Sequence, residues 1–168
     1  MSRKIIQTSL FLVVFVLVAS SALAQKGFAP PPLIPYGLSI NVESAKKAAA
    51  AAIAEARKNN WAMAIAIVDP GGHLVYFEKM DGTQTGSVDV SIEKARSAAL
   101  FRRPTKVFQD GAAAGGDGLR LLRLTGAVPI DGGFPIIVDG KLIGGIGISG
   151  GAGEQDGQVA RAGAESLK

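Results

Sequence analysis

The stretch Gly132-Gly-Phe-Pro-Ile-Ile-Val-Asp-Gly-Lys-Leu-Ile-Gly-Gly-Ile-Gly-Ile-Ser-Gly-Gly151 contains two apolar runs on either side of Asp139-Gly140. This dipeptide favours the positive φ angles of a two-residue type I′ turn, whose twist matches that of paired antiparallel strands. The stretch therefore predicts a β-hairpin. The glycines of Gly144-Gly-Ile-Gly147 remove side chains from the second strand, so another chain segment, another subunit or a flat ligand is expected to approach that backbone closely.

Two short motifs in the same stretch suggest chemistry that their context does not support. Gly145-Ile-Gly-Ile-Ser-Gly150 matches the dinucleotide pattern G-x-G-x-x-G, but such a site needs a parallel crossover and an acidic residue about 20 positions later. The tight turn instead predicts an antiparallel strand. Ser149 fits the pattern G-x-S-x-G, but a nucleophile elbow needs a histidine partner, and His73 is the only histidine. The context therefore favours neither a nucleotide site nor a hydrolase.

The first 24 residues have the organisation of a secretory signal peptide. Arg3 and Lys4 precede a short apolar core, and Ala22-Leu-Ala24 provides small residues at the cleavage position. We expect cleavage between Ala24 and Gln25. The mature protein is then expected to be periplasmic or secreted and to lack a stable membrane anchor, because the apolar run is too short to span a bilayer comfortably.

Composition narrows the possible functions. Removal of the signal peptide leaves 144 of the 168 residues, which suits one domain, and lowers the net charge from +4 to +2, because 16 basic residues then face 14 acidic ones. Few aromatic residues and no basic cluster beyond Arg102-Arg103 give nucleic-acid binding little support. The absence of cysteine excludes disulfides and, with a single histidine, a closed structural zinc site.

Apolar periodicity predicts a helix followed by a first hairpin. Residues 25–38 form a proline-rich extended arm, expected to be either a flexible leader or a segment that lies on a neighbouring subunit. Asn41 caps the helix, which carries a stripe of alanines. Strands over residues 61–68 and 73–79 then flank Asp69-Pro-Gly-Gly72, a sequence typical of a tight turn.

The rest of the chain predicts two more helices around the central hairpin. Ser87 caps a helix that ends before Pro104 and carries Lys94 and Arg96 on its surface. A glycine-rich irregular segment follows, and residues 153–167 form the last helix after the hairpin. Two antiparallel hairpins flanked by helices indicate an α/β fold of the α+β class.

A series of motifs in a fixed order spans nearly all of the mature chain. The motifs are Asp69-Pro-Gly-Gly-His-Leu-Val75, Lys79-Met-Asp-Gly82, Glu93-Lys-Ala-Arg-Ser-Ala-Ala99, Arg103-Pro-Thr105, Gly132-Gly-Phe-Pro135, Asp139-Gly140, and Gly144-Gly-Ile-Gly-Ile-Ser-Gly-Gly151 followed by Gln155-Asp156. In these motifs the chain resembles the GlcG/HbpS family over roughly residues 39–167.

The resemblance implies a profilin-like fold, with a central antiparallel sheet flanked by helices, and symmetric homo-oligomers that are often octamers. It assigns residues 39–168 to one GlcG/HbpS-like domain. The family is described as haem-binding or haem-degrading and includes the C-terminal domain of the propanediol-utilisation corrinoid adenosyltransferase. Haem or a related tetrapyrrole is therefore the expected cofactor, although fold similarity alone assigns no chemistry.

His73 is the only imidazole in the chain and therefore the candidate axial ligand for haem iron. The alternative is an ordinary residue at the start of a strand, on the same face as Val75 and Phe77 by strand alternation. Met80 is the other soft candidate ligand, although methionine more often fills gaps in a core. The residues themselves leave the role of His73 open.

Three residues near a predicted helix end complete the candidate cofactor site. Arg102 and Arg103 have the chemistry to hold haem propionates or another carboxylate, and both also suit a helix C-terminus as cations. The Thr105 hydroxyl is placed either to contact a ligand or to cap one further helical turn.

Three functions are consistent with these residues. The first is an exported oligomer that binds haem or another tetrapyrrole through His73 and turns over no substrate on its own. The second is a haem-degrading or small organic-acid enzyme at a subunit interface, with Asp69, Asp81 and Lys94 as catalytic candidates, although Asp69 also suits a role in its own turn. The third is a structural module whose glycine-rich hairpin builds the oligomer.

Overall fold

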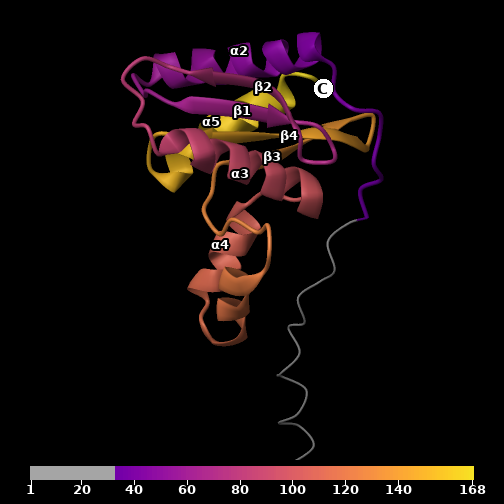
Figure 1. The fold of residues 1–168 in the computed structure, drawn as a ribbon, viewed down its shortest axis with the longest axis vertical. Coiled ribbons are helices and arrows are strands. Elements are labelled where there is room, and N and C mark those ends of the chain that lie inside the picture. Colours follow the sequence, from indigo (N-terminus) through magenta and orange to yellow (C-terminus); the bar gives the residue numbers. More distant parts are fainter. Residues whose placement is uncertain (1–32) are drawn as a thin grey trace, which may run out of the picture. The chain divides into compact units, whose positions relative to one another are not determined.

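A four-stranded antiparallel sheet forms the centre of the structure, a computed structural model that describes residues 33–168. The strands are β1 (Ala64–Val68), β2 (Leu74–Lys79), β3 (Gly133–Val138) and β4 (Lys141–Ser149), in the spatial order β2-β1-β4-β3 (Figure 1). Strand β4 is antiparallel to both of its neighbours. The predicted α+β fold of two hairpins is confirmed, and β4 lacks the parallel crossover that a dinucleotide site requires.

The β3–β4 connection is the type I′ turn that the sequence predicts. Asp139 has a φ of 49° and Gly140 a φ of 72°, the positive values that this turn requires at both central positions. The turn pairs Val138 with Lys141 and sets the register of the central hairpin.

Helices cover both faces of the sheet (Figure 1). On one face, α2 (Val42–Lys58) and α5 (Gly153–Glu165) pack against the isoleucines of β1 and β4. Asn41 caps α2, as predicted, by accepting a hydrogen bond from the Ser44 amide at 2.8 Å. On the other face, α3 (Ser87–Phe101) packs against Ala66 and Val68 of β1. The sheet is therefore the middle of three layers.

The glycines of β4 contact α3 of the same chain. A Cβ atom added at Gly147 would collide with the Ser91 carbonyl oxygen and the Ala95 amide nitrogen, both of which belong to the α3 backbone. A Cβ at Gly145 would lie 2.5 Å from the Ala95 carbonyl oxygen. Of the three possibilities that the sequence leaves open, the close partner is therefore a chain segment of the same subunit.

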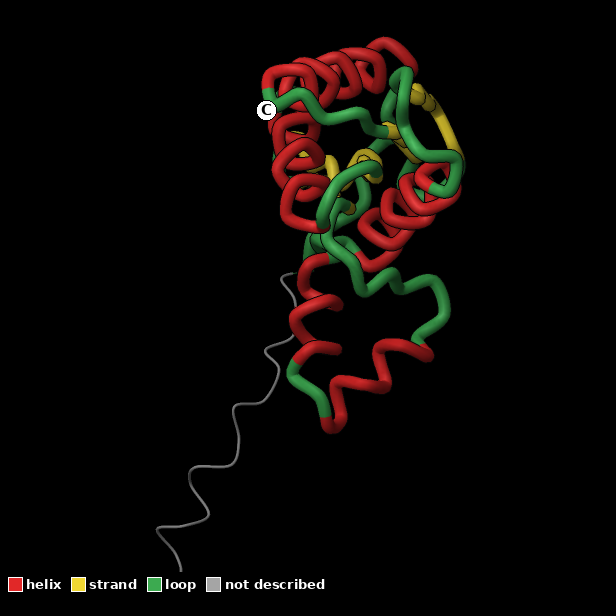
Figure 2. Tube along the Cα trace, turned by 90° about the vertical axis from the view of Figure 1, so that its left-hand side faces the viewer, coloured by secondary structure: helices red, strands yellow, loops and turns green. Residues whose placement is uncertain are grey.

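Between α3 and β3 the chain forms two short helices where an irregular segment was expected. Helix α4 (Lys106–Ala113) is longer than the single predicted turn, and η1 (Gly116–Arg123) is a 3₁₀ helix. Figure 2 shows both projecting away from the sheet and its covering helices. Leu119 and Leu122 of η1 are consequently exposed to solvent, whereas Leu121 is partly buried.

The predicted signal peptide and the first part of the proline-rich arm lie outside the described residues. The described remainder of the arm runs along β4 of the same chain, where Leu142 donates to the Pro35 carbonyl at 2.9 Å and accepts from the Gly37 amide at 2.7 Å. Among residues 33–168, no helix has the length and apolar character needed to cross a membrane.

Two predictions about α3 are wrong. Ser87 does not cap the helix, because Gly86 occupies the N-cap position and Ser87 is the first helical residue. Lys94 is not on the surface but is buried, and its ammonium donates to the Asp156 carboxylate at 2.7 Å and to the Ile148 carbonyl at 3.0 Å. The buried face of α3 consists mostly of alanine and serine. These small side chains leave room for the long side chain of Lys94, and this is the sequence signal that could have predicted its burial.

Candidate functional site

The β1–β2 turn is built around the carboxylate of Asp69. One carboxylate oxygen, Oδ1, accepts from the His73 amide at 2.9 Å, and the other, Oδ2, lies 3.2 Å from Nδ1 of the His73 ring. The Gly72 amide donates to the Asp69 carbonyl at 3.0 Å and closes the turn. Strand β2 begins only at Leu74, so His73 is a turn residue.

This arrangement determines which ring nitrogen of His73 is open. Partial burial acts to raise the pKa of Asp69, but hydrogen bonds from the His73 backbone and ring outweigh it and lower the pKa below its ordinary value. The carboxylate therefore stays ionised and can only accept, so Nδ1 carries the proton in its bond. In this tautomer Nε2 carries the lone pair, on a side chain that is 82% exposed.

A small apolar surface lies beside this histidine. Gly72 is next to the side chain of Leu100 at the end of α3, and the Tyr36 hydroxyl donates to the Leu100 carbonyl at 3.3 Å. Leu74, Leu100 and Tyr36 are each about half exposed. We call the surface formed by these three residues and His73 the His73 surface.

Strict alternation fails in β2, so the predicted grouping of His73 with Val75 and Phe77 is wrong. The pairing of β1 with β2 shifts between Ile67 and Val68, which leaves Val75 as an extra residue. Val75 packs with the core under α2, whereas Phe77 packs with the cluster under α3.

Two arginines border the His73 surface. Arg102 ends α3 with a φ of 54°, and its guanidinium lies 5.1 Å from the centre of the Tyr36 ring. Arg96 donates through Nε to the Gly72 carbonyl at 3.0 Å. Sequence reasoning missed this arginine, since only the fold brings it against the turn. The other predicted propionate partner, Arg103, lies over the Phe108 ring of α4 instead.

Two further candidates have structural roles. The Thr105 side chain is fully buried and accepts a hydrogen bond from the Gly133 amide at 2.9 Å, which fixes the start of β3. It does not cap α4 through its side chain, as was predicted as one alternative. Met80 packs against the core under α2. Neither side chain is presented to a ligand at the His73 surface.

The three catalytic candidates are not brought together. Asp69 and Asp81 lie just beyond opposite ends of β2, which spans six residues and therefore about 20 Å. Lys94 is buried in its ion pair with Asp156. Ser149 is likewise remote from His73, since it pairs with Ala64 at the far end of β1 and donates to the Ser87 hydroxyl.

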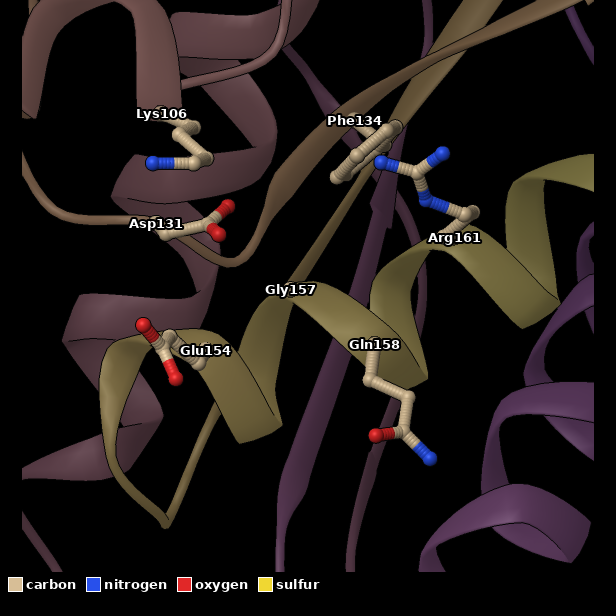
Figure 3. A pocket seen from close by; sticks show the side chains of 7 residues that line it. All are labelled: Lys106, Asp131, Phe134, Glu154, Gly157, Gln158 and Arg161. Atoms are coloured by element: carbon tan, nitrogen blue, oxygen red, sulfur yellow. The ribbon is translucent and has the colours of Figure 1, made fainter. Parts of the chain in front are cut away.

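The structure also contains a pocket that sequence reasoning did not find. It has a volume of about 370 Å³ and lies between the start of α4, the loop before β3, the start of β3 and residues 154–161 of α5 (Figure 3). Its lining residues are Lys106, Asp131, Phe134, Glu154, Gly157, Gln158 and Arg161. We call it the Asp131 pocket after its one buried acid. No motif marks it, because its residues come from α4, a loop, β3 and α5.

Residues 40–165 match the family described as "Haem degrading protein HbpS-like". The chain belongs to the HbpS-like family. The protein GlcG of Escherichia coli K12 is 41% identical over 95 residues, which are 56% of this chain and 69% of that protein. The GlcG/HbpS resemblance seen in the motifs is thereby confirmed.

Solved structures of HbpS-like proteins show the same fold. A double mutant of HbpS from Streptomyces reticuli is 30% identical, with a TM-score of 0.72 over 83% of this chain and 94% of that one. A structure described as a PduOC:heme complex is 26% identical, with a TM-score of 0.69 over 78% of this chain and 96% of that one. The second of these relatives was solved with haem.

Proposed function

We propose that this protein binds haem or a related tetrapyrrole at the His73 surface, with Nε2 of His73 as the axial ligand. The observation that carries the proposal is the bond between the Asp69 carboxylate and Nδ1 of His73. A carboxylate in this position is the usual partner of a metal-binding histidine, because it fixes the tautomer and the ring orientation and makes the ligand more basic. The family description and the haem complex of a relative support this choice of ligand.

The residues around His73 fit a flat amphiphilic macrocycle. Leu74, Leu100 and Tyr36 provide exposed apolar contacts, and Arg102 provides a cation for one propionate. Arg96 is already paired with Glu93 at 2.6 Å, so a second propionate would compete with that carboxylate for it. The site is an open surface rather than an enclosed cleft, so a second copy of the chain is the natural cover for the exposed face of the ligand. When bound, haem would supply redox chemistry, and this chain's residues would hold and orient it.

The proposal includes export and self-association. The sequence of residues 1–24 supports passage across a membrane with cleavage after Ala24, and the open His73 surface supports a homo-oligomer. Binding without turnover is favoured, because Asp69, Asp81 and Lys94 are held apart in separate parts of the fold.

The proposal is tested by titrating haem into the chain from Gln25 onward and monitoring the Soret absorbance. We expect saturable binding in the wild type. In His73→Ala, the spectrum of the coordinated iron should be lost. Asp69→Asn should weaken binding by about 10-fold or more, because the ring loses its orienting carboxylate. Met80→Leu is the matched control, since it removes the other soft side chain but keeps its packing.

Added imidazole separates ligand loss from misfolding in this experiment. If His73→Ala removes only the ligand, free imidazole should restore the spectrum of the coordinated iron. Equal binding by the wild type and His73→Ala would contradict the proposal, as would a loss of binding in Met80→Leu.

A further inference from the structure

The Asp131 pocket contains a buried carboxylate that packs against two glycines of α5. Asp131 is only 6% exposed. A Cβ atom added at Gly157 would collide with the Asp131 carboxylate, and one added at Gly153 would lie 3.7 Å from its Cβ. Glycines four residues apart share one face of a helix. This face of α5 therefore holds the acid at the wall of the pocket.

One oxygen of this carboxylate is already bonded and the other is available. Oδ1 accepts from the Gly132 amide at 2.7 Å. Within residues 33–168, no donor is bonded to Oδ2. Oδ2 is not among the buried unpartnered side-chain atoms of the described residues, so solvent reaches it. This oxygen is therefore accessible to a ligand that brings a cation or another hydrogen-bond donor.

The Arg161 guanidinium lies over the Phe134 ring in another part of the same pocket. Arg161 lies 5.1 Å above the centre of the Phe134 ring, and no carboxylate in the described part of the chain forms an ion pair with it. Figure 3 shows these two side chains apart from Asp131 and Glu154. Stacking on an aromatic ring leaves the edge of a guanidinium open, and that edge binds a carboxylate through two parallel hydrogen bonds.

The other polar residues of the pocket are Lys106, Gln158 and Glu154. The first two already bond to residues outside the pocket. Lys106 pairs with Asp110 at 2.7 Å, and Gln158 donates to Glu55 outside the pocket at 2.6 Å. Glu154 adds a second negative charge near Asp131. One end of the pocket therefore has the two carboxylates of Asp131 and Glu154 with the Lys106 ammonium nearby, and the other end has the Arg161 guanidinium.

We propose that the Asp131 pocket binds a small zwitterion, with the ligand carboxylate on the Arg161 guanidinium and the ligand ammonium on Oδ2 of Asp131. An α-amino acid is the simplest molecule of this class, and Phe134 offers an apolar contact for its side chain. This site uses none of the residues of the His73 surface, so the two proposals stand or fall separately.

Binding is tested by nuclear magnetic resonance on the chain from Gln25 onward, which contains the whole compact unit of residues 33–168. L-alanine is titrated and the amides of Asp131, Phe134 and Gly157 are followed. Propionate and ethylammonium, which carry one charged group each, are the matched probes. We expect saturable shifts with L-alanine and affinities at least about 10-fold weaker for the two single-charge probes, since each lacks one charge-assisted contact.

Three variants relate the binding to the proposed contacts. Asp131→Asn keeps an acceptor for the Gly132 amide but loses the charge, and Arg161→Gln removes the guanidinium; each should weaken L-alanine binding about 10-fold or more. Arg57→Gln, on the exposed last turn of α2, should leave it unchanged. The proposal is overturned if L-alanine produces no saturable shifts, if propionate alone binds as well, or if the two pocket variants bind like the wild type.

The pH dependence gives an independent check. Burial raises the pKa of Asp131 above its ordinary value, although nearby cations act in the opposite direction. The charged groups around it are Lys94, Lys106, Glu154, Asp156 and Arg161. L-alanine binding should weaken as the pH falls through this raised pKa, because protonation removes the charge that holds the ammonium. In Asp131→Asn the residual binding should not change over that range, and a pH response equal to that of the wild type would overturn the assignment.

Discussion

Gly147→Ala is expected to lower the free energy of unfolding by about 3 kcal/mol, because the added methyl group would overlap the backbone of α3. The colliding atoms are the carbonyl oxygen of Ser91 and the amide nitrogen of Ala95, so no rotamer change can relieve the overlap. The helix would have to move away from β4 and open the core beneath it. Urea unfolding of the variant and the wild type measures the difference.

Gly86→Ala is the matched control for this prediction. Gly86 precedes α3 with a φ of −60°, and a Cβ atom there has nothing within 4 Å. Its replacement should cost less than about 1 kcal/mol. If Gly147→Ala were as stable as Gly86→Ala, the close contact of β4 with α3 would not be what requires glycine at this position.

Lys94→Met is expected to cost about 3–5 kcal/mol at neutral pH, because it leaves the Asp156 carboxylate buried without its cation. Both side chains are at most 3% exposed, and their atoms are 2.7 Å apart. The pair joins α3 to the first turns of α5, and Asp156 also accepts from the Gly151 amide at 2.9 Å. Removal of the cation therefore strains the junction of β4 with α5. Urea unfolding at neutral and acidic pH measures the cost.

The pH dependence of this cost has a definite sign. Burial raises the pKa of Asp156 above its ordinary value, and Lys94 acts against that effect. Without the lysine the pKa should rise further, so the stability lost at neutral pH should be regained as the pH falls and Asp156 becomes neutral. Lys94→Met combined with Asp156→Asn should cost less than Lys94→Met alone at neutral pH, since no buried charge remains.

The exposed pair of Lys46 with Glu43 provides the control for this ion pair. Its atoms are 3.3 Å apart, and both side chains are more than half exposed. Lys46→Met should change stability by less than about 1 kcal/mol. Equal effects of Lys94→Met and Lys46→Met would contradict the stabilising role of the buried pair.

Local sequence signals predicted the two hairpins and the helices around them, but not the two short helices between α3 and β3. Asp139-Gly140 predicted the turn because its backbone angles depend on the two residues themselves, and Asn41 predicted a helix start for the same reason. The prediction that Ser87 is the N-cap was wrong because both serine and glycine are favoured at this position, and Gly86 precedes Ser87. The bulge at Val75 could not be predicted, since it depends on the pairing of two strands.

The candidate site could be predicted only in part. Asp69 and His73 lie within one turn, so their proximity could be predicted from the sequence. Arg96 and Leu100 reach that turn only because α3 packs against β1. The Asp131 pocket combines residues from α4, a loop, β3 and α5. A pattern read along the chain does not reveal groups that tertiary packing assembles.

Crystals of the haem-loaded chain would locate the iron and so test the proposed coordination by His73. Anomalous scattering at the iron absorption edge identifies the metal without reference to the rest of the map. We expect one iron peak within bonding distance of Nε2 of His73, with Asp69 still bonded to Nδ1 and the macrocycle against Leu74 and Leu100. An iron peak elsewhere, with His73 not bonded to the metal, would contradict haem binding at the His73 surface.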